Sequence, residues 1–288
     1  MTFGEGVERL VASGPEIETG SFASARWLLC PPSSIKVVCW NINRGLQLPR
    51  IIEFLSRSQA DILLLQEADL NARRTHHLNV AREIARKLEL NYVFGREFQE
   101  LTQGTSQSPA YHGQATLSRW PLSNARILRF QQQSGFWHPR WFLPEIEPFQ
   151  ERLGGRMALV AYANVGGTLV VTYNLHLESR GDDRLRGAQI KEAIQDAQRY
   201  NSDTAVVFAG DLNIDVSAGE IAQVIRRADF QDAFGDQHTP TTPNSFLADG
   251  RVIDWIFSRG SLRSGAAQVH RSVAGSDHYP LSATLDFG

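Results

Sequence analysis

Polar residues that can bind a metal ion or a phosphate group stand at the ends of short apolar runs along most of this chain. The apolar runs cover residues 35–39, 62–65, 169–175 and 205–209 and have the composition of buried strands. A polar residue at the end of a buried strand is held at the rim of the sheet, where parallel and mixed sheets place their chemistry. The pattern therefore indicates an enzyme. The motifs at or near such runs are Trp40-Asn41-Ile42-Asn43, Leu65-Gln66-Glu67, Asn174-Leu175-His176-Leu177, Gly210-Asp211-Leu212-Asn213, Ile253-Asp254-Trp255 and Ser276-Asp277-His278.

Helical and strand-like segments share the chain. Apolar residues recur at helical spacing in 78–90 and 184–200, and a shorter helix is expected at 49–58. This content predicts an α/β fold in which two sheets pack face to face with helices outside. The strand-like runs cover residues 61–66, 115–118, 124–130, 157–164, 168–175, 205–210, 252–257 and 281–285.

Length and charge limit the classes of function. A chain of 288 residues with 42% hydrophobic content can bury one large core, so one domain is expected. The formal net charge of −2 provides no overall basic field of the kind that drives non-specific nucleic-acid binding, although a local basic groove remains open. The two cysteines, Cys30 and Cys39, are expected to be reduced thiols rather than a disulfide scaffold.

Residues 1–34 differ from the rest of the chain. They carry several charged residues, contain no apolar core of the length a signal peptide needs, and end in Pro31-Pro32-Ser33-Ser34, a cluster that breaks regular structure. They are predicted to form an appended arm of unknown role, followed by a catalytic domain over residues 35–288. With no run of about 18 apolar residues anywhere, we expect a cytoplasmic protein without integral membrane association.

The ordered set of motifs W-N-x-N, L-Q-E, N-x-H-L, G-D-L-N, I-D-W and S-D-H resembles the endonuclease/exonuclease/phosphatase superfamily of metal-dependent phosphohydrolases. The resemblance covers roughly residues 35–287. It implies a four-layer α/β sandwich, in which two packed mixed β-sheets are flanked by helices. It also implies hydrolysis of phosphate esters.

A divalent metal ion is the cofactor that the sequence predicts. Glu67 ends an apolar run where a carboxylate would be poorly solvated unless it met a cation, and by resemblance it is the metal-binding glutamate. Asn41 and Asp277 are expected to complete or support the metal shell. Oxygen ligands in this number suit Mg²⁺ or Mn²⁺ better than zinc. Asn43 stands where many relatives have an aspartate, which makes a second metal ion less secure.

The catalytic roles also follow from the resemblance. Asp211 is expected to activate the attacking water and Asn213 to hold the phosphate. Asp254 is expected to fix the ring of His278, which as a cation would donate to a non-bridging phosphate oxygen. In the deoxyribonuclease and sphingomyelinase branches, the histidine at the position of His176 contacts the scissile phosphate or the leaving group.

Further candidates for phosphate binding rest on weaker signals. Gln114 lies in the segment 112–119, which resembles G-N-A-x-L-S-R with glutamine in place of asparagine. Arg156 and Arg180 belong to a group of arginines that could grip phosphate bidentately. The remaining members are Arg73, Arg74, Arg152, Arg184 and Arg186; most should only solubilise the surface, and two or three of the whole group should be functional.

Residues 131–155 form a proline-broken loop that carries Phe136, Trp137, Trp141, Phe142 and Phe149. The rings either cover a sheet edge and the body of the domain, which is favoured, or form a platform for a base or an apolar substrate.

Three functions remain open at this point. The first is a phosphodiesterase that acts on nucleic acid or on a smaller diester. The second is a phosphatase or phospholipase-type enzyme that acts on lipid or inositol phosphates. The third, a non-catalytic binding module, is disfavoured because the whole set of chemical residues is retained. The acidic balance weighs mildly against a tight non-specific nuclease, and no protein partner is indicated.

Overall fold

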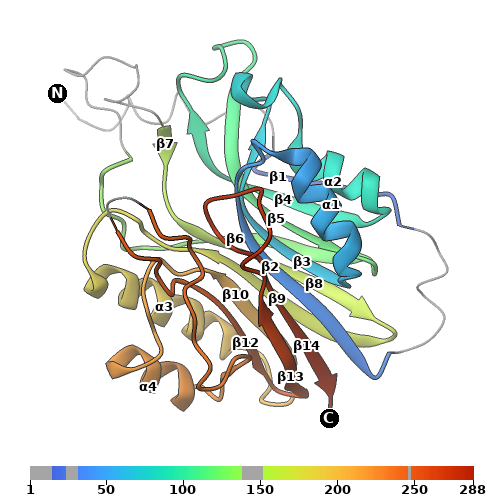
Figure 1. The fold of residues 1–288 in the computed structure, drawn as a ribbon, viewed down its shortest axis with the longest axis vertical. Helices are drawn as coiled ribbons and strands as arrows, with labels where there is room; N and C mark the ends of the chain where they lie inside the picture. Colours follow the sequence, from blue (N-terminus) through green and yellow to red (C-terminus); the bar gives the residue numbers. More distant parts are fainter. Residues whose placement is uncertain (1–14, 24–31, 138–151, 246–247) are drawn as a thin grey trace.

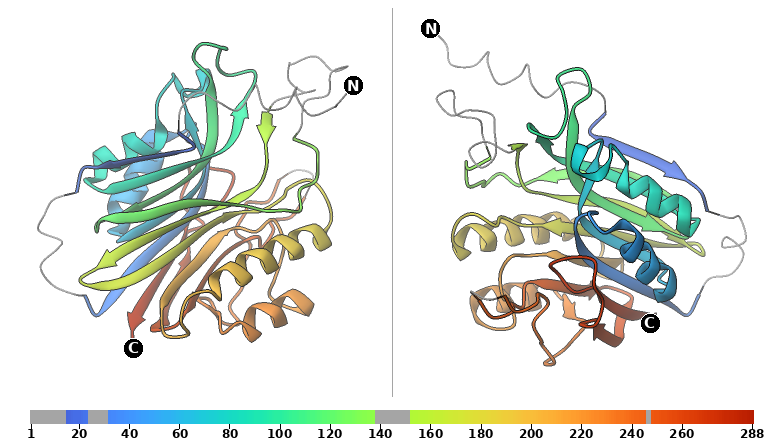
Figure 2. Two further views of the ribbon diagram at one scale, coloured as in Figure 1. Left: turned by 180° about the vertical axis from the view of Figure 1, so that it is seen from behind. Right: turned by 45° about the horizontal axis from the view of Figure 1, so that its top comes forward.

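The computed structural model describes residues 15–23, 32–137, 152–245 and 248–288, which form two stacked β-sheets with helices on their outer faces (Figures 1 and 2). The larger sheet has the strand order β1-β4-β5-β3-β2-β14-β13, with β7 paired to β4, and the smaller has the order β11-β12-β10-β9-β8-β6. Both sheets mix parallel and antiparallel pairs, which confirms the predicted α/β sandwich.

The strands of the larger sheet are β1 (Ile17–Ser21), β2 (Ser34–Arg44), β3 (Ile62–Leu70), β4 (Asn91–Glu100), β5 (Ala110–Ser118), β7 (Arg152–Gly154), β13 (Leu262–Val269) and β14 (Leu281–Phe287). Those of the smaller sheet are β6 (Leu122–Arg129), β8 (Met157–Val165), β9 (Thr168–His176), β10 (Ala205–Asp211), β11 (Gln231–Asp232) and β12 (Asp254–Arg259). The helices are α1 (Leu48–Ser58), α2 (Val80–Leu88), α3 (Asp183–Ala197) and α4 (Gly219–Arg227), with a 3₁₀ turn at Arg73–Thr75.

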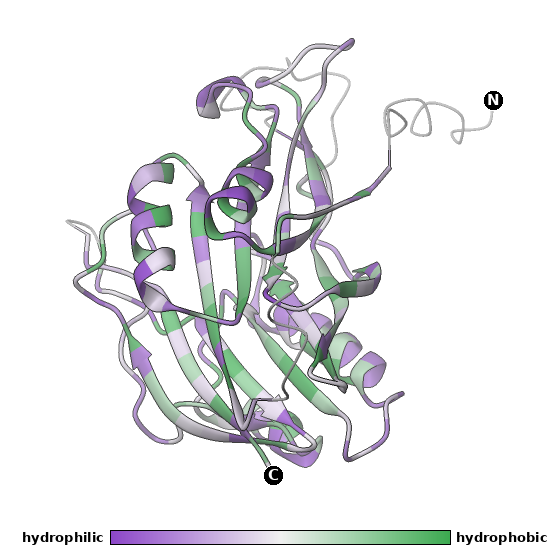
Figure 3. Ribbon diagram, turned by 90° about the vertical axis from the view of Figure 1, so that its right-hand side faces the viewer, coloured by the Kyte–Doolittle hydropathy of each residue, from purple (hydrophilic) through white to green (hydrophobic). Residues whose placement is uncertain are grey.

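Apolar clusters hold the four layers together. One cluster joins α1 and α2 to the larger sheet, and another joins α3 and α4 to the smaller sheet. A third fills the space between the sheets with small and branched residues such as Val37, Ile62 and Val207. In Figure 3 hydrophobic colour is frequent along the strands, and each helix shows both hydrophobic and hydrophilic colour, as expected for helices buried on one face. Among the described residues, no helix combines the length and the apolar composition needed to cross a membrane.

Two motif residues link the sheets through polar contacts. The side chain of Gln66 donates from Nε2 to Asn174 Oδ1 over 2.7 Å, and Asn174 Nδ2 donates to the carbonyls of Leu65 and Ala115. Gln66 and Asn174 are both fully buried. Buried amides persist only when their hydrogen bonds are made, so the Gln of L-Q-E and the Asn of N-x-H-L fix how the sheets sit against each other beneath the rim.

The helices expected at 49–58, 78–90 and 184–200 are present as α1, α2 and α3, and each predicted strand has a counterpart. Strands β1, β4, β7, β11 and β13 and helix α4 were not predicted, and β7 lies in the segment 131–155 that was expected to be a loop. Part of the expected arm belongs to the larger sheet, because β1 pairs antiparallel with β4. Residues 1–14 and 24–31, which include Cys30, lie outside the described residues. Cys39 is a buried free thiol.

Replacing Gly210 with alanine should destabilise the fold, because β10 and β9 approach closely at this residue. A Cβ atom at position 210 would lie 1.9 Å from the carbonyl oxygen of Leu175. Relief of such a clash requires a backbone shift, so we expect a loss of about 1–3 kcal/mol in the free energy of unfolding, measured by urea denaturation. In Gly265→Ala the nearest atoms lie at 3.2 Å, and the loss should be smaller. Equal stability of Gly210→Ala and wild type would contradict this packing.

Candidate functional site

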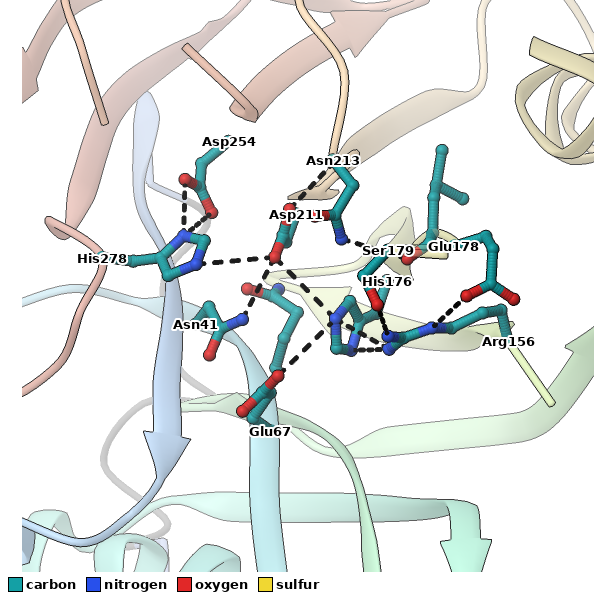
Figure 4. A network of polar contacts seen from close by, with 12 residues as sticks. Asn41, Glu67, Arg156, His176, Glu178, Ser179, Asp211, Asn213, Asp254 and His278 are labelled. Atoms are coloured by element: carbon teal, nitrogen blue, oxygen red, sulfur yellow. Dashed lines mark hydrogen bonds and ion pairs between the residues drawn. The ribbon is translucent and has the colours of Figure 1, made fainter. Parts of the chain in front are cut away.

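The polar motifs converge at one end of the two sheets (Figure 4). Asn41 and Glu67 come from the neighbouring parallel strands β2 and β3 of the larger sheet. In the smaller sheet, His176 ends β9, Asp211 ends β10 and Asp254 begins β12. Strand β10 lies between β9 and β12, so Asp211 pairs with His176 on one side and with Asp254 on the other. Because both sheets present these ends to the same side, residues far apart in sequence form one cluster of polar side chains, which we call the pocket.

Irregular backbone aims several of these side chains. Glu67 (φ 56°) and Asn213 (φ 53°) both have left-handed conformations, which are uncommon for residues other than glycine and often mark functional sites. The register between β3 and β5 shifts from Leu65 to Ala68, so Glu67 lies in a bulge. Bulges redirect side chains, and this one lets the carboxylate of Glu67 reach the rim while Gln66 remains between the sheets.

Asp211 occupies the centre of the pocket. Its Oδ2 atom accepts a hydrogen bond from Asn41 Nδ2 at 3.1 Å, and its Oδ1 atom accepts one from the backbone N–H of Asn213 at 2.9 Å. Two imidazoles face the same Oδ2 atom, with His278 Nε2 at 3.7 Å and His176 Nε2 at 3.8 Å. The side chain is almost fully buried. This carboxylate is therefore a proton acceptor that is largely shielded from water.

His278 and Asp254 form a buried ion pair. Nδ1 of His278 lies 2.8 Å from Oδ2 of Asp254, and the Thr241 hydroxyl donates to the same oxygen over 2.6 Å. Burial alone would lower the pKa of His278, but the charges of Asp254 and Asp211 raise it to about 10. At neutral pH the ring is therefore a cation. Asp211, Asp254 and His278 also offer ligand atoms within 4.8 Å of one another, and the ion pair of His278 with Asp254 joins them in one charge network.

The loop that carries His278 is anchored to the W-N-x-N motif. The indole Nε1 of Trp40 donates to the carbonyl of His278 at 2.9 Å. The hydroxyl of Ser276 donates to the carbonyl of Asn41 at 2.6 Å and also bonds Asp277 Oδ1. These bonds bring Asp277 and Asn41 together.

Glu67 is the carboxylate best suited to hold a divalent cation. Burial alone would raise its pKa, but the charges of His112, His176, Arg44 and Arg152 hold it well below the usual range. The group is therefore ionised and partly accessible, with 17% of its side chain exposed. Figure 4 shows Asn41 near Glu67, and Asp277 is exposed and linked to the backbone of Asn41 through Ser276. These oxygen donors suit a hard ion such as Mg²⁺ that keeps several waters.

A buried layer of charge lies beneath His176. Its Nδ1 is 3.1 Å from Glu97 Oε2, and Arg156 pairs with Glu97 Oε1 at 3.0 Å. Arg156 also donates to the Ser179 hydroxyl. The charges of His176 and Arg156 outweigh burial and lower the pKa of Glu97. Arg156 therefore stabilises the wall of the pocket in this arrangement, and its predicted contact with phosphate stays untested.

Gln114 has a different place from the one predicted. It is fully buried between the sheets, where Nε2 donates to the carbonyl of Met157 at 2.9 Å and Oε1 accepts from the N–H of Leu159 at 3.2 Å. Both ends of the amide are occupied by the backbone of β8, so the side chain is not available to a phosphate. We correct this assignment to an inter-sheet link.

The other arginines divide between exposed and paired positions. Arg180 is exposed, with its guanidinium 4.9 Å from the ring centre of Phe136. Arg74 pairs with both Asp69 and Glu100. Arg152 lies 3.0 Å from Glu100, and Arg186 pairs with Asp183. A phosphate contact from any of these would require an existing contact to change, except at Arg180.

The aromatic loop is described only in part. The indole of Trp137 is buried and donates to Glu178 Oε1 at 3.0 Å, and its ring packs on Phe98. At this residue the loop therefore covers the body of the domain, as the favoured interpretation expected. Phe136 is 49% exposed. Trp141, Phe142 and Phe149 lie outside the described residues.

Sequence reasoning missed three residues of the site. Thr241 holds Asp254, Glu97 holds His176 and Arg156, and His112 lies beside Glu67 and His176. Glu97 and His112 belong to β4 and β5, and the only sequence signal was charge within otherwise apolar or aromatic segments. Thr241 lies in a proline-flanked loop and had no signal.

The sequence and the fold were compared with known families and solved structures. Residues 38–278 match the family described as the Endonuclease/Exonuclease/phosphatase family. No curated protein matches the sequence.

Among solved structures, the chain is similar to an endonuclease/exonuclease/phosphatase from Beutenbergia cavernae DSM 12333, with a TM-score of 0.66, 19% identity, and coverage of 89% of this chain and 72% of that one. It is also similar to TDP2 from Caenorhabditis elegans, with a TM-score of 0.62, 19% identity, and coverage of 88% and 74%. The human Nocturnin catalytic domain with bound sulfate anion gives a TM-score of 0.61, 17% identity, and coverage of 95% and 97%. The TM-scores establish the common fold. The family match over most of the chain shows that the protein belongs to the endonuclease/exonuclease/phosphatase family, whose members are phosphoester hydrolases that depend on divalent metal ions.

Proposed function

We propose that this protein is a phosphodiesterase that uses Mg²⁺ or Mn²⁺. The observation that carries the proposal is the position of Asp211, which accepts from Asn41 and Asn213 while two imidazole nitrogens face it within 3.8 Å. A carboxylate held in this way can take a proton from a water molecule next to an anionic substrate.

Each side chain has a distinct role in the proposed reaction. The oxygen of water forms a bond to phosphorus, its proton passes to Asp211, and the bond from phosphorus to the ester oxygen breaks. The His278 cation donates to a non-bridging oxygen, and Asp254 keeps the ring oriented. Asn213 and His176 face the same pocket and contact the phosphate or the leaving group. A divalent ion held by Glu67, Asn41 and Asp277 would neutralise charge on the phosphate.

The charges of the pocket favour a diester over a monoester. A monoester carries a second negative charge at neutral pH and needs additional cations. Of the candidate arginines, Arg156 and Arg74 are already paired with Glu97 and Asp69 at 3.0 and 2.7 Å, and the exposed Arg180 could supply one such cation. The nuclease and phosphatase neighbours are compatible with nucleic acid or a smaller diester as substrate. Activity on lipid or inositol phosphates is the competing outcome.

Substrate class can be decided with a panel of bis-p-nitrophenyl phosphate, p-nitrophenyl phosphate, plasmid DNA, RNA and phosphoinositides, each with and without Mg²⁺. We expect faster turnover of the bis ester than of the monoester. The reverse ratio, or turnover of phosphoinositides alone, would contradict the assignment as a phosphodiesterase.

Activity on the best substrate should disappear in excess EDTA and return with Mg²⁺ or Mn²⁺, because oxygen ligands surround the proposed ion. Glu67→Gln should raise the Mg²⁺ concentration for half-maximal rate by at least about tenfold, the lower end of the cost of perturbing even an indirect metal contact. Initial rates over a Mg²⁺ titration measure both effects.

Glu89→Gln is the matched control for this titration, because Glu89 also has a left-handed backbone (φ 53°) but caps helix α2 on the surface. Its Mg²⁺ dependence should equal that of wild type. Full turnover in EDTA would exclude a metal-dependent mechanism.

A further inference from the structure

A second cluster of metal-binding side chains adjoins the proposed Mg²⁺ site. Glu67, His112 and His176 each offer one ligand atom, and these atoms lie within 4.8 Å of one another. His112 and His176 are almost fully buried, and Glu67 opens to the pocket. The two imidazoles come from β5 and β9, in different sheets, so this grouping exists only in the folded chain.

Both rings are oriented by buried carboxylates. Nδ1 of His112 lies 3.3 Å from Asp69 Oδ1, and Nδ1 of His176 lies 3.1 Å from Glu97 Oε2. A carboxylate that accepts from one ring nitrogen leaves the other free to bind a metal, and such carboxylate–histidine pairs surround most metal sites with histidine ligands. Nε2 of His176 lies 3.9 Å from Glu67 Oε1, so the second nitrogen of this ring faces the glutamate.

His112 Nε2 provides an independent sign of an absent ligand. This atom is buried and has no hydrogen-bond partner among the described residues. Buried ring nitrogens without a partner are costly and need an explanation. A metal ion between His112 and Glu67 would satisfy the nitrogen.

Arginines pair with the carboxylates behind the two rings, and one of these arginines also lies against His176. Arg74 binds Asp69 through two bonds, and Arg156 binds Glu97, so the carboxylates behind the rings are neutralised from outside. Arg156 Nη1 also lies 2.8 Å from His176 Nε2. Metal binding therefore requires Arg156 to move away from Nε2 of His176. The contacts of Arg156 with Glu97 and Ser179 can remain during this movement.

We infer that Glu67, His112 and His176 form a site for a borderline divalent transition metal such as Zn²⁺ or Co²⁺. Two imidazoles and one carboxylate select such ions over Mg²⁺, which prefers oxygen ligands. This inference rests on the proposed function, which supplies the phosphate substrate next to the site. It deepens that function, because Glu67 would be shared with the Mg²⁺ site. The pocket could then place two cations beside one substrate.

The test measures metal binding in the absence of substrate. Metal-free full-length protein is dialysed against Zn²⁺ with Mg²⁺ in large excess, and bound zinc per chain is determined by mass spectrometry. Wild type should retain one Zn²⁺. His112→Gln and His176→Gln should each raise the Kd for Zn²⁺ by about 10- to 100-fold or more, since even outer-shell changes cost this much.

Two further measurements keep the result interpretable. Co²⁺ bound to wild type should show visible absorption bands that weaken in His112→Gln, and circular dichroism shows whether each variant folds. If His112→Gln does not fold, His176→Gln and the wild-type spectrum decide. His77→Gln is the control for surface chelation, because His77 is exposed next to His76, and it should retain Zn²⁺ as wild type does.

The outcomes separate this site from the proposed function. Failure of wild type to retain Zn²⁺, or an unchanged Kd in folded His112→Gln, would overturn the transition-metal site even if Mg²⁺-dependent hydrolysis is observed. Loss of Zn²⁺ in His77→Gln would assign binding to the surface and equally overturn it. Tight, His112-dependent Zn²⁺ binding in a protein that hydrolyses no phosphate ester would sustain the site and overturn the phosphodiesterase.

Discussion

Asp211→Asn should lower kcat by about 10²- to 10⁴-fold, the usual contribution of a general base, while KM changes little. Asparagine keeps the size of the side chain and can still accept the N–H of Asn213, which lies 2.9 Å from Oδ1. The substitution removes the charge and the basic oxygen that Asn41 and the two imidazoles surround. Contacts of the substrate with His278 and Asn213 remain, so the loss should fall on the rate of the chemical step.

Asp215→Asn provides a matched control in the same loop. Asp215 Oδ1 accepts from the N–H of Ser217 at 2.9 Å, the same two-residue turn that Asp211 makes with Asn213, but Asp215 is exposed. Its kcat should equal that of wild type. Steady-state kinetics on the best substrate of the panel measures both variants. If Asp211→Asn retained more than about a tenth of the wild-type kcat, well above the expected range, another group would have to be the base.

The positions of the site residues could be anticipated because the ends of buried strands are visible in the sequence as the ends of apolar runs. The apolar runs at 62–65 and 205–209 are followed two residues later by Glu67 and Asp211. Buried strands of a mixed sheet bring such ends to a common rim. The family resemblance then ordered the motifs. The structure shows Asn41, Glu67, His176, Asp211, Asp254 and His278 around one pocket.

Side-chain direction within the strands could not be anticipated. Alternation along β5 puts His112 and Gln114 on one face, and that face lies between the sheets, where Gln114 binds the backbone of β8. The motif alone gave no means of telling this face from the rim. The bulge that turns Glu67 outward could not be anticipated either, since a shift of one residue in register reverses which side chains are buried.

Long-range charge pairing was also hidden from the sequence. Arg156 was grouped with arginines that could bind phosphate, but its partner Glu97 lies 59 residues earlier, in a strand that was not predicted. Segment 91–100 mixes glycine, charge and aromatics, and its register shifts between Arg96 and Phe98 to place Glu97 in a bulge. Strand patterns weaken where bulges interrupt the two-residue period. The part of the site beneath His176 therefore required the structure.

The ion pair of His278 with Asp254 should act as one unit in catalysis. His278→Ala is expected to lower kcat by about 10²- to 10³-fold, the cost of removing one donor to a developing anion. Asp254→Asn should give a loss of similar kind, because the ring then loses the carboxylate 2.8 Å from Nδ1 that orients it and helps to raise its pKa to about 10. Asparagine can still accept from the Thr241 hydroxyl, so the fold is kept.

The double variant distinguishes a coupled pair from two separate contributions. If Asp254 acts through His278, the double variant should lose no more than about what His278→Ala loses alone, since the effects of coupled residues do not add in free energy. Independent residues would multiply their losses, and that result would contradict the pairing. Asp232 and His238 form a second aspartate–histidine pair at 2.7 Å, with both side chains 19% exposed. The same three substitutions there should leave kcat at the wild-type value, which separates loss of this ion pair from loss of any ion pair.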